Sequence, residues 1–81
     1  MVDESRRLVI CLDNSGYEAS LERRKVYAAL PDPDGARHGQ IRVVDESGED
    51  YLYPARCFVE AELPQAARQA LLQSVDNIQA D

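Results

Sequence analysis

The stretch DESGEDYLYPARCFV, residues 45–59, sets the architecture of this chain. Gly48 supplies the positive φ that a tight hairpin requires, and strand-like residues flank it: QIRVVD at 40–45 and DYLYP at 50–54. Pro54 cannot donate a backbone hydrogen bond, so the second strand has to end there or lie at an edge. The stretch therefore predicts a hairpin, a corner and a last short strand at residues 58–62.

Two further strands are predicted upstream: residues 7–12, which contain a short apolar run, and residues 25–30, whose apolar residues alternate. Pro31 ends the second of them, and the turn-rich segment PDPDGARHGQ predicts a loop before residue 40. The expected interior of the sheet consists of Val9, Cys11, Val26, Ala28, Ile41, Val43, Leu52 and Val59. The first strand is apolar on both faces, which leaves an outer strip formed by Leu8, Ile10 and Leu12.

The period of the sequence changes after residue 63. From Pro64 onward the apolar residues recur at helical spacing, and we expect one helical stripe made of Ala67, Leu71, Val75 and Ile78. An isolated helix of this length is marginal in water, so its stripe needs a packing partner. We predict that it docks over the outer strip, either on its own barrel or on that of a second chain.

Together these elements resemble a known architecture. The segment DYLYPARCFVEAE, in which a strand leads through a proline into one 3₁₀ turn and a last strand, resembles the end of a Src-homology-3-like barrel. The longer pattern CLDNSGYEASLE, KVY, IRVVDESGEDYLYP and FV is similar to a group of small, uncharacterised bacterial proteins that share this barrel. The resemblance covers residues 8–62. It implies a mainly β fold, with a small five-stranded Src-homology-3-like barrel in residues 1–62. The tail lies outside the resemblance, and its helical spacing adds one C-terminal amphipathic α-helix in residues 63–81.

The peptide-binding members of that fold hold proline-rich ligands between aromatic side chains. This chain has Tyr17 in the corresponding loop and Pro54 at the corresponding turn, but it contains no tryptophan, and Arg56 and Cys57 stand where a tyrosine is expected. The resemblance therefore does not extend to the recognition of proline-rich peptides.

The tyrosines nevertheless suggest a contact surface. By alternation Tyr51 and Tyr53 project from one face of their strand, opposite Leu52, so they lie outside the barrel if Leu52 points into it. Aromatic side chains and arginine are enriched where proteins bind each other. The candidate binding residues are Tyr17, Tyr51, Tyr53 and Arg56. Alternatively, the tyrosines pack against the tail helix or cover a rim of the barrel.

Charge argues against several classes of partner. Fifteen acidic residues against nine Lys and Arg leave a formal charge of −6, which disfavours nucleic acid and anionic membrane surfaces. The chain opens without the pattern of a secretory signal and has no long apolar run, so we expect a cytoplasmic location. A reducing cytoplasm predicts that Cys11 and Cys57 are buried, unbonded thiols.

The sequence offers no catalytic constellation. The acids around Gly48 read as a solvated turn, and His38 is the single histidine, in a loop beside Gly39. The four glycines lie in turns rather than in a phosphate-binding loop, and no metal-ligand spacing occurs, so we expect no cofactor and no metal. We therefore expect a non-catalytic protein-interaction module with a protein or peptide partner. The alternative is a structural or regulatory small protein that acts as a homodimer without a small-molecule ligand.

Overall fold

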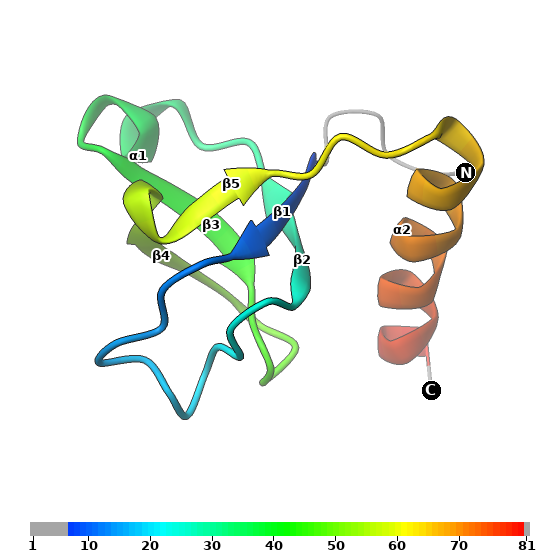
Figure 1. Ribbon diagram of the computed structural model, residues 1–81, viewed down its shortest axis with the longest axis horizontal. Helices are drawn as coiled ribbons and strands as arrows, with labels where there is room; N and C mark the ends of the chain where they lie inside the picture. Colours follow the sequence, from blue (N-terminus) through cyan, green and yellow to red (C-terminus); the bar gives the residue numbers. More distant parts are fainter. Residues whose placement is uncertain (1–6, 81) are drawn as a thin grey trace.

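The computed structural model describes residues 7–80, and the side chains of residues 7–73, as a curled sheet with a helix beside it (Figure 1). The strands in chain order are β1 (Arg7–Cys11), β2 (Val26–Leu30), β3 (Gln40–Val44), β4 (Asp50–Pro54) and β5 (Phe58–Glu60). Helix α1 (Pro33–Arg37) lies between β2 and β3, the 3₁₀ turn η1 (Ala55–Cys57) joins β4 to β5, and helix α2 (Gln65–Ala80) follows β5. All of the predicted strands are present, with ends that differ by a residue or two.

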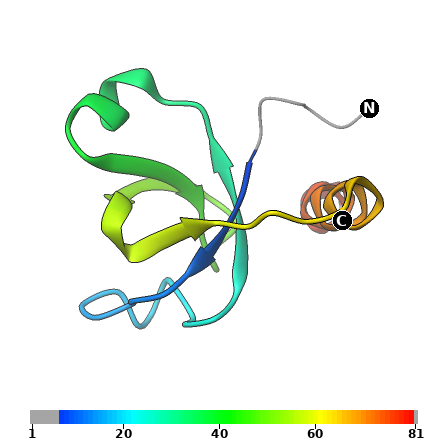
Figure 2. The same cartoon turned by 45° about the horizontal axis from the view of Figure 1, so that its top comes forward.

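The sheet is antiparallel throughout, and its strand order is β4-β3-β2-β1-β5. It curls into a half-barrel, in which β4 and β5 are the two outer strands (Figure 2). The prediction of a mainly β, barrel-like fold with a C-terminal helix is confirmed. Its assignment to the Src-homology-3-like type stays a prediction.

The interior of β2 differs from the expected one. Tyr27 and Ala29 are buried in the main core, whereas Ala28 packs on the outer face, with Val26 beside it. The register explains this, because Val9 pairs directly with Tyr27, and residues opposite each other in neighbouring strands share a face. The prediction that Val26 and Ala28 point inward is therefore wrong.

The same correction applies to β4 and β5. Tyr53 is 4% exposed and lies in the main core, while Leu52 and Val59 are exposed. Tyr53 is placed opposite Ile41, and Tyr51 opposite the fully buried Val43. The tyrosine pair therefore shares one face, as predicted, but this is the inner face of the sheet. The interior predicted at Val9, Cys11, Ile41 and Val43 is confirmed.

Helix α2 docks on the outside of its own sheet. Leu72 is 1% exposed and packs with Leu8 and Ala28 in a second apolar cluster, with Val26 and Ala61 at its margin. Figure 2 shows α2 nearly end-on, beside β1 and β2. Of the outer strip, Leu8 contacts the helix in this way, whereas Leu12 at the other end of the strip is exposed.

The predicted apolar stripe of α2 is wrong, because a neighbouring face of the helix packs against the sheet. The contact residue is Leu72, whereas Leu71 and Ala67 are exposed. The side chains of Val75 and Ile78, the other two members of that stripe, lie outside the described residues.

Helix α1 stands where the sequence predicts only a loop. Asp32 caps it, since its carboxylate accepts a hydrogen bond from the amide of Gly35, and Pro33 occupies the first turn, where a missing N–H is harmless. Gly35 allows close packing, because a Cβ there would lie 2.9 Å from Cδ2 of Leu52. Helix α1 therefore covers part of the outward face of β4.

Candidate functional site

A groove of about 390 Å³ brings together three of the four predicted site residues. It runs between the long loop after β1, the β3–β4 hairpin and strand β4. Its lining consists of Tyr17, Ser20, Asp45, Ser47, Tyr51, Leu52 and Tyr53. We call it the tyrosine groove.

The aromatic base of the tyrosine groove is continuous with the core. The rings of Tyr17 and Tyr53 meet edge to face, with centroids 5.1 Å apart. The ring of Tyr53 also meets that of Phe58, with centroids 6.2 Å apart. Such T-shaped pairs are a preferred aromatic geometry. Tyr17 comes from the long loop and is half-buried, so this stacking holds the loop against the sheet.

Asp45 forms the polar floor of the groove and is only 7% exposed. Its carboxylate accepts hydrogen bonds from the Tyr53 hydroxyl at 2.6 Å, from the Ser47 amide at 2.9 Å and from the Ser47 hydroxyl. Burial alone raises the pKa of a carboxyl group, but the bonds from Ser47 and Tyr53 outweigh it and hold the pKa of Asp45 below its usual value. Asp45 is therefore a buried, ionised anchor rather than the solvated turn residue that the sequence suggested.

The next residue makes a parallel connection. Glu46 accepts hydrogen bonds from the hydroxyl of Tyr27 and from Lys25, and these two bonds, Lys25 foremost, lower its pKa. The amide of Glu46 also donates to the carbonyl of Ser20 at 3.0 Å, which ties the hairpin to the long loop. The walls of the tyrosine groove are thus fixed to one another by hydrogen bonds.

The rim of the groove is exposed and negatively charged. Tyr51 is 49% exposed on the inner face of β4, and Leu52, which follows it on the outward face, is 37% exposed. The Tyr51 hydroxyl donates to Glu49 at 3.2 Å, and the negative charge of Glu49 is the main cause that raises the pKa of Tyr51. A cation or an apolar side chain could approach this rim.

Arg56, the fourth predicted residue, lies elsewhere. It is exposed on η1 and is not part of the lining of the groove. Its charge reaches Asp13, whose pKa is lowered mainly by hydrogen bonds from Ser15 and to a smaller extent by Arg56 and Arg23. Arg56 is only three residues after Tyr53 in the sequence, but its position on η1 lies outside the lining of the tyrosine groove.

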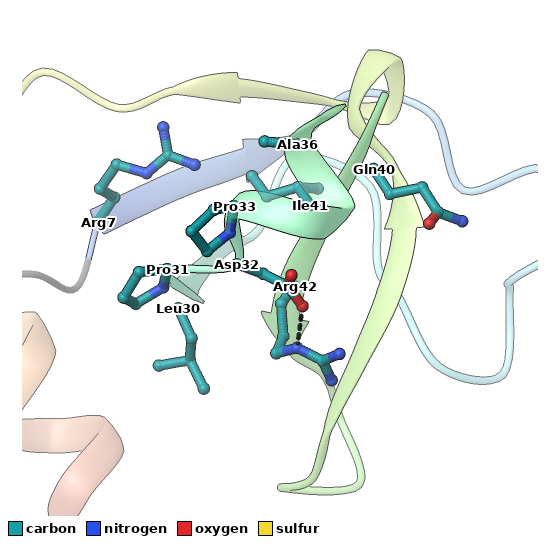
Figure 3. A pocket seen from close by; sticks show the side chains of 9 residues that line it. All are labelled: Arg7, Leu30, Pro31, Asp32, Pro33, Ala36, Gln40, Ile41 and Arg42. Carbon is teal, nitrogen blue, oxygen red and sulfur yellow. Dashed lines mark hydrogen bonds and ion pairs between the residues drawn. The ribbon is translucent and has the colours of Figure 1, made fainter. Parts of the chain in front are cut away.

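A second depression, of about 320 Å³, lies beside α1 (Figure 3). Figure 3 shows Arg42 of β3 reaching Asp32 at the start of α1, with Arg7 on the opposite side. Arg42 contacts Asp32 at 2.8 Å and Asp50 at 3.0 Å, and Arg7 contacts Glu60 at 3.2 Å. Both arginines are therefore engaged in ion pairs, which leaves the tyrosine groove as the better candidate for a site.

Within residues 7–80, the described side chains contain no group of three or more His, Cys, Asp or Glu residues arranged to hold a metal ion. Over the same range, no helix has the length and apolar character required to cross a bilayer. His38, the single histidine, is exposed, and its Nδ1 lies 2.8 Å from the carbonyl oxygen of Asp34.

Comparison with known proteins identifies no relative. No family model matches the sequence, no curated protein matches it, and no solved structure matches the fold. The resemblance to Src-homology-3-like proteins thus remains an interpretation of sequence motifs.

Proposed function

We propose that this protein is a non-catalytic protein-interaction module that binds a segment of a partner protein in the tyrosine groove. The observation that carries the proposal is the exposure of Tyr51, a large aromatic side chain, at the rim of a groove whose floor is held by buried hydrogen bonds. Aromatic residues dominate the binding energy of protein interfaces. A floor that is already rigid lowers the entropy that binding costs.

The same proposal places the half-barrel in the Src-homology-3-like class. The antiparallel order β4-β3-β2-β1-β5 and the 3₁₀ turn between the last two strands support this placement. We also propose a cytoplasmic location, which is supported by two buried cysteines that are not bonded to each other.

The proposal is tested by affinity capture with matched variants. The chain is immobilised, exposed to a lysate of the cells that produce it, and the captured proteins are quantified by mass spectrometry. The test variant is Tyr51→Ala, and the control is Leu12→Ala, which truncates a residue that is 54% exposed and lies outside the groove. Circular dichroism verifies that both variants are folded.

We expect at least one protein that wild type and Leu12→Ala capture equally and that Tyr51→Ala loses by tenfold or more. Capture that is identical for all three forms, or no capture by wild type, contradicts binding in the tyrosine groove.

A further inference from the structure

The outer side of β4 is a free edge. β4 is the last strand in the sheet order, and in the part of the chain that the structure describes no strand pairs with its outer side. An unpaired strand edge presents backbone N–H and C=O groups that another chain can bind. The register of the sheet identifies which groups these are.

Two hydrogen bonds bracket the β3–β4 ladder. The amide of Asp45 donates to the carbonyl of Glu49 at 3.0 Å, and the amide of Ala55 donates to the carbonyl of Gly39 at 2.9 Å. Directly opposite residues in antiparallel strands alternate between bonded and non-bonded pairs. Counting inward from either bonded end pair, Asp45–Glu49 or Gly39–Ala55, gives the same alternation. Tyr51 and Tyr53 therefore form backbone hydrogen bonds with β3, whereas the N–H and C=O of Leu52 point outward.

The outward groups end at Pro54, which has no N–H to donate. Asp50 and Leu52 are thus the two residues whose amide and carbonyl both face the edge. A strand added here makes its main bonds to these two residues.

The tyrosine groove follows this edge. Its lining includes three consecutive residues of β4, Tyr51, Leu52 and Tyr53. Because β4 is the last strand in the sheet order, a groove over these residues lies beside the outward backbone groups of that strand. The groove therefore offers backbone groups and an aromatic wall to the same ligand.

The charge of the site selects the ligand. The hairpin carries four acids, of which Glu46 is paired with Lys25 and Asp50 with Arg42. Glu49 has no basic partner among the described ion pairs and is exposed at the rim, while the buried, ionised Asp45 adds negative charge beneath it. Basic side chains on the ligand supply the missing charge.

We propose that the tyrosine groove binds an extended, basic segment of a partner protein, which adds to the free edge of β4 as an additional antiparallel or parallel strand. This inference rests on the proposed function and specifies its mode and the chemistry of the partner. Strand addition of this kind uses main-chain bonds for affinity and side-chain pockets for specificity.

A second copy of the chain is a poorer occupant of the same edge. Antiparallel pairing of two β4 strands about Leu52 places Pro54 of each chain opposite Asp50 of the other, so the bond that Pro54 would donate is missing on both sides. It also brings together two edges of the same negative charge.

The test uses amide hydrogen exchange on the whole protein, followed by NMR, with synthetic peptides as probes. The first peptide alternates lysine and valine, the second alternates glutamate and valine, and the third is the lysine peptide with methylated backbone nitrogens. The amide of Leu52 reports strand addition, whereas the amides of Tyr51 and Tyr53 serve as internal controls because they already bond to β3.

We expect the lysine peptide to slow exchange at Leu52 at least tenfold with little change at Tyr51 and Tyr53, and the other two peptides to have no effect. The effect should weaken as salt is added. Equal protection by the glutamate or the methylated peptide overturns the proposal, as does lack of protection by the lysine peptide. Protection of Leu52 without peptide, in a chain that sediments as a dimer, assigns the edge to a second copy and also overturns it.

The outcome is separable from that of the proposed function. A captured partner that depends on Tyr51 but leaves the Leu52 amide unprotected refutes strand addition and keeps the interaction module. Lack of any Tyr51-dependent partner refutes both.

Discussion

At the scale of single residues, two tyrosine–carboxylate pairs connect the core of the protein to its hairpin. The hydroxyl of Tyr53 in β4 donates a hydrogen bond to Asp45, and the hydroxyl of Tyr27 in β2 donates one to the next residue, Glu46. A buried hydroxyl without a partner is costly, and these bonds remove that cost. Alternation along β4 allows either Tyr53 or Leu52 to face the core. Tyr53 can do so without an unpaired buried hydroxyl, because Asp45 accepts its hydrogen bond.

Replacing Tyr53 by phenylalanine tests this connection. Tyr53→Phe keeps the ring in the core but deprives the buried carboxylate of Asp45 of one donor, so we expect the free energy of unfolding to fall by about 1 to 3 kcal/mol. Urea denaturation measures the change. Tyr51→Phe is the matched control, because its hydroxyl bonds to Glu49 at the exposed rim, and it should leave the midpoint nearly unchanged. Equal midpoints for the two variants contradict the role of Asp45 as a buried anchor.

The same tyrosines predict the behaviour of the protein in alkali. Burial, followed by the bond to Asp45, raises the pKa of Tyr53 from 10.0 to about 12, and burial, followed by Glu46, raises the pKa of Tyr27. A pKa raised by folding contributes stability that is complete below the pKa of the unfolded chain and is lost as the pH rises through the folded value. We therefore expect stability to decline between about pH 10 and 12.

Phenolate absorbance during a pH titration checks this expectation. At least two of the four tyrosines should ionise late and together with the loss of circular dichroism, whereas the chain in denaturant should titrate all four near their usual pKa. A folded protein in which all four ionise early contradicts the burial of Tyr27 and Tyr53.

At the scale of elements, α2 is held to the sheet by a narrow contact. Leu72 is the one large apolar side chain of α2 that is buried within the described part of the helix, against Leu8 and Ala28. A helix of this length depends on such packing for its stability in water. The contact also protects Leu8 of β1, which would otherwise be an exposed apolar residue on the back of the sheet.

Neighbouring leucines allow a direct test of this contact. Leu72→Ala removes a buried side chain and should lower the free energy of unfolding by about 2 to 4 kcal/mol. Leu71→Ala removes the same atoms from a position that is 37% exposed, and should cost less than about 1 kcal/mol. Thermal and urea denaturation of both variants measure the difference. A larger loss for Leu71→Ala means that a different face of α2 meets the sheet.

At the scale of the whole molecule, the two cysteines meet in the core although they are far apart in the chain. Cys11 ends β1, Cys57 ends η1, and both are buried and free. Burial, and secondly the neighbouring Cys57, raise the pKa of the Cys11 thiol, which reduces its reactive thiolate form. Access to both thiols therefore requires the half-barrel to open.

Thiol reactivity thus reports the opening of the entire sheet. We expect slow reaction of the native protein with a disulfide reagent, at a rate that increases in parallel with urea-induced unfolding, and two rapid equivalents in full denaturant without reductant. Two rapid equivalents from the native protein contradict burial. An absence of reactive thiol in denaturant shows that the cysteines form a disulfide, and that their free state is wrong.

The prediction of elements from the sequence succeeded where the signals are local. Gly48 and Pro54 mark the hairpin and the corner, and the change of period after Pro64 marks α2. It missed α1, because five residues are too few to show a helical period, although Asp32 followed by Pro33 is a local signal for the start of a helix. For the site, Tyr17, Tyr51 and Tyr53 were identified, and Pro54 indicated that β4 ends or lies at an edge, but the buried role of Asp45 was not predicted.

The sequence by itself therefore determined the order of the strands along the chain, the turns, and the fact that Tyr51 and Tyr53 share a face. Alternation assigns the residues of a strand to two faces, but it does not show which of the two faces packs against the core. Only the tertiary structure decided that Tyr27 and Tyr53 face the core, because register places them opposite Val9 and Ile41, and the hairpin supplies acceptors for their hydroxyls. Contacts between segments remote in the chain supply that information.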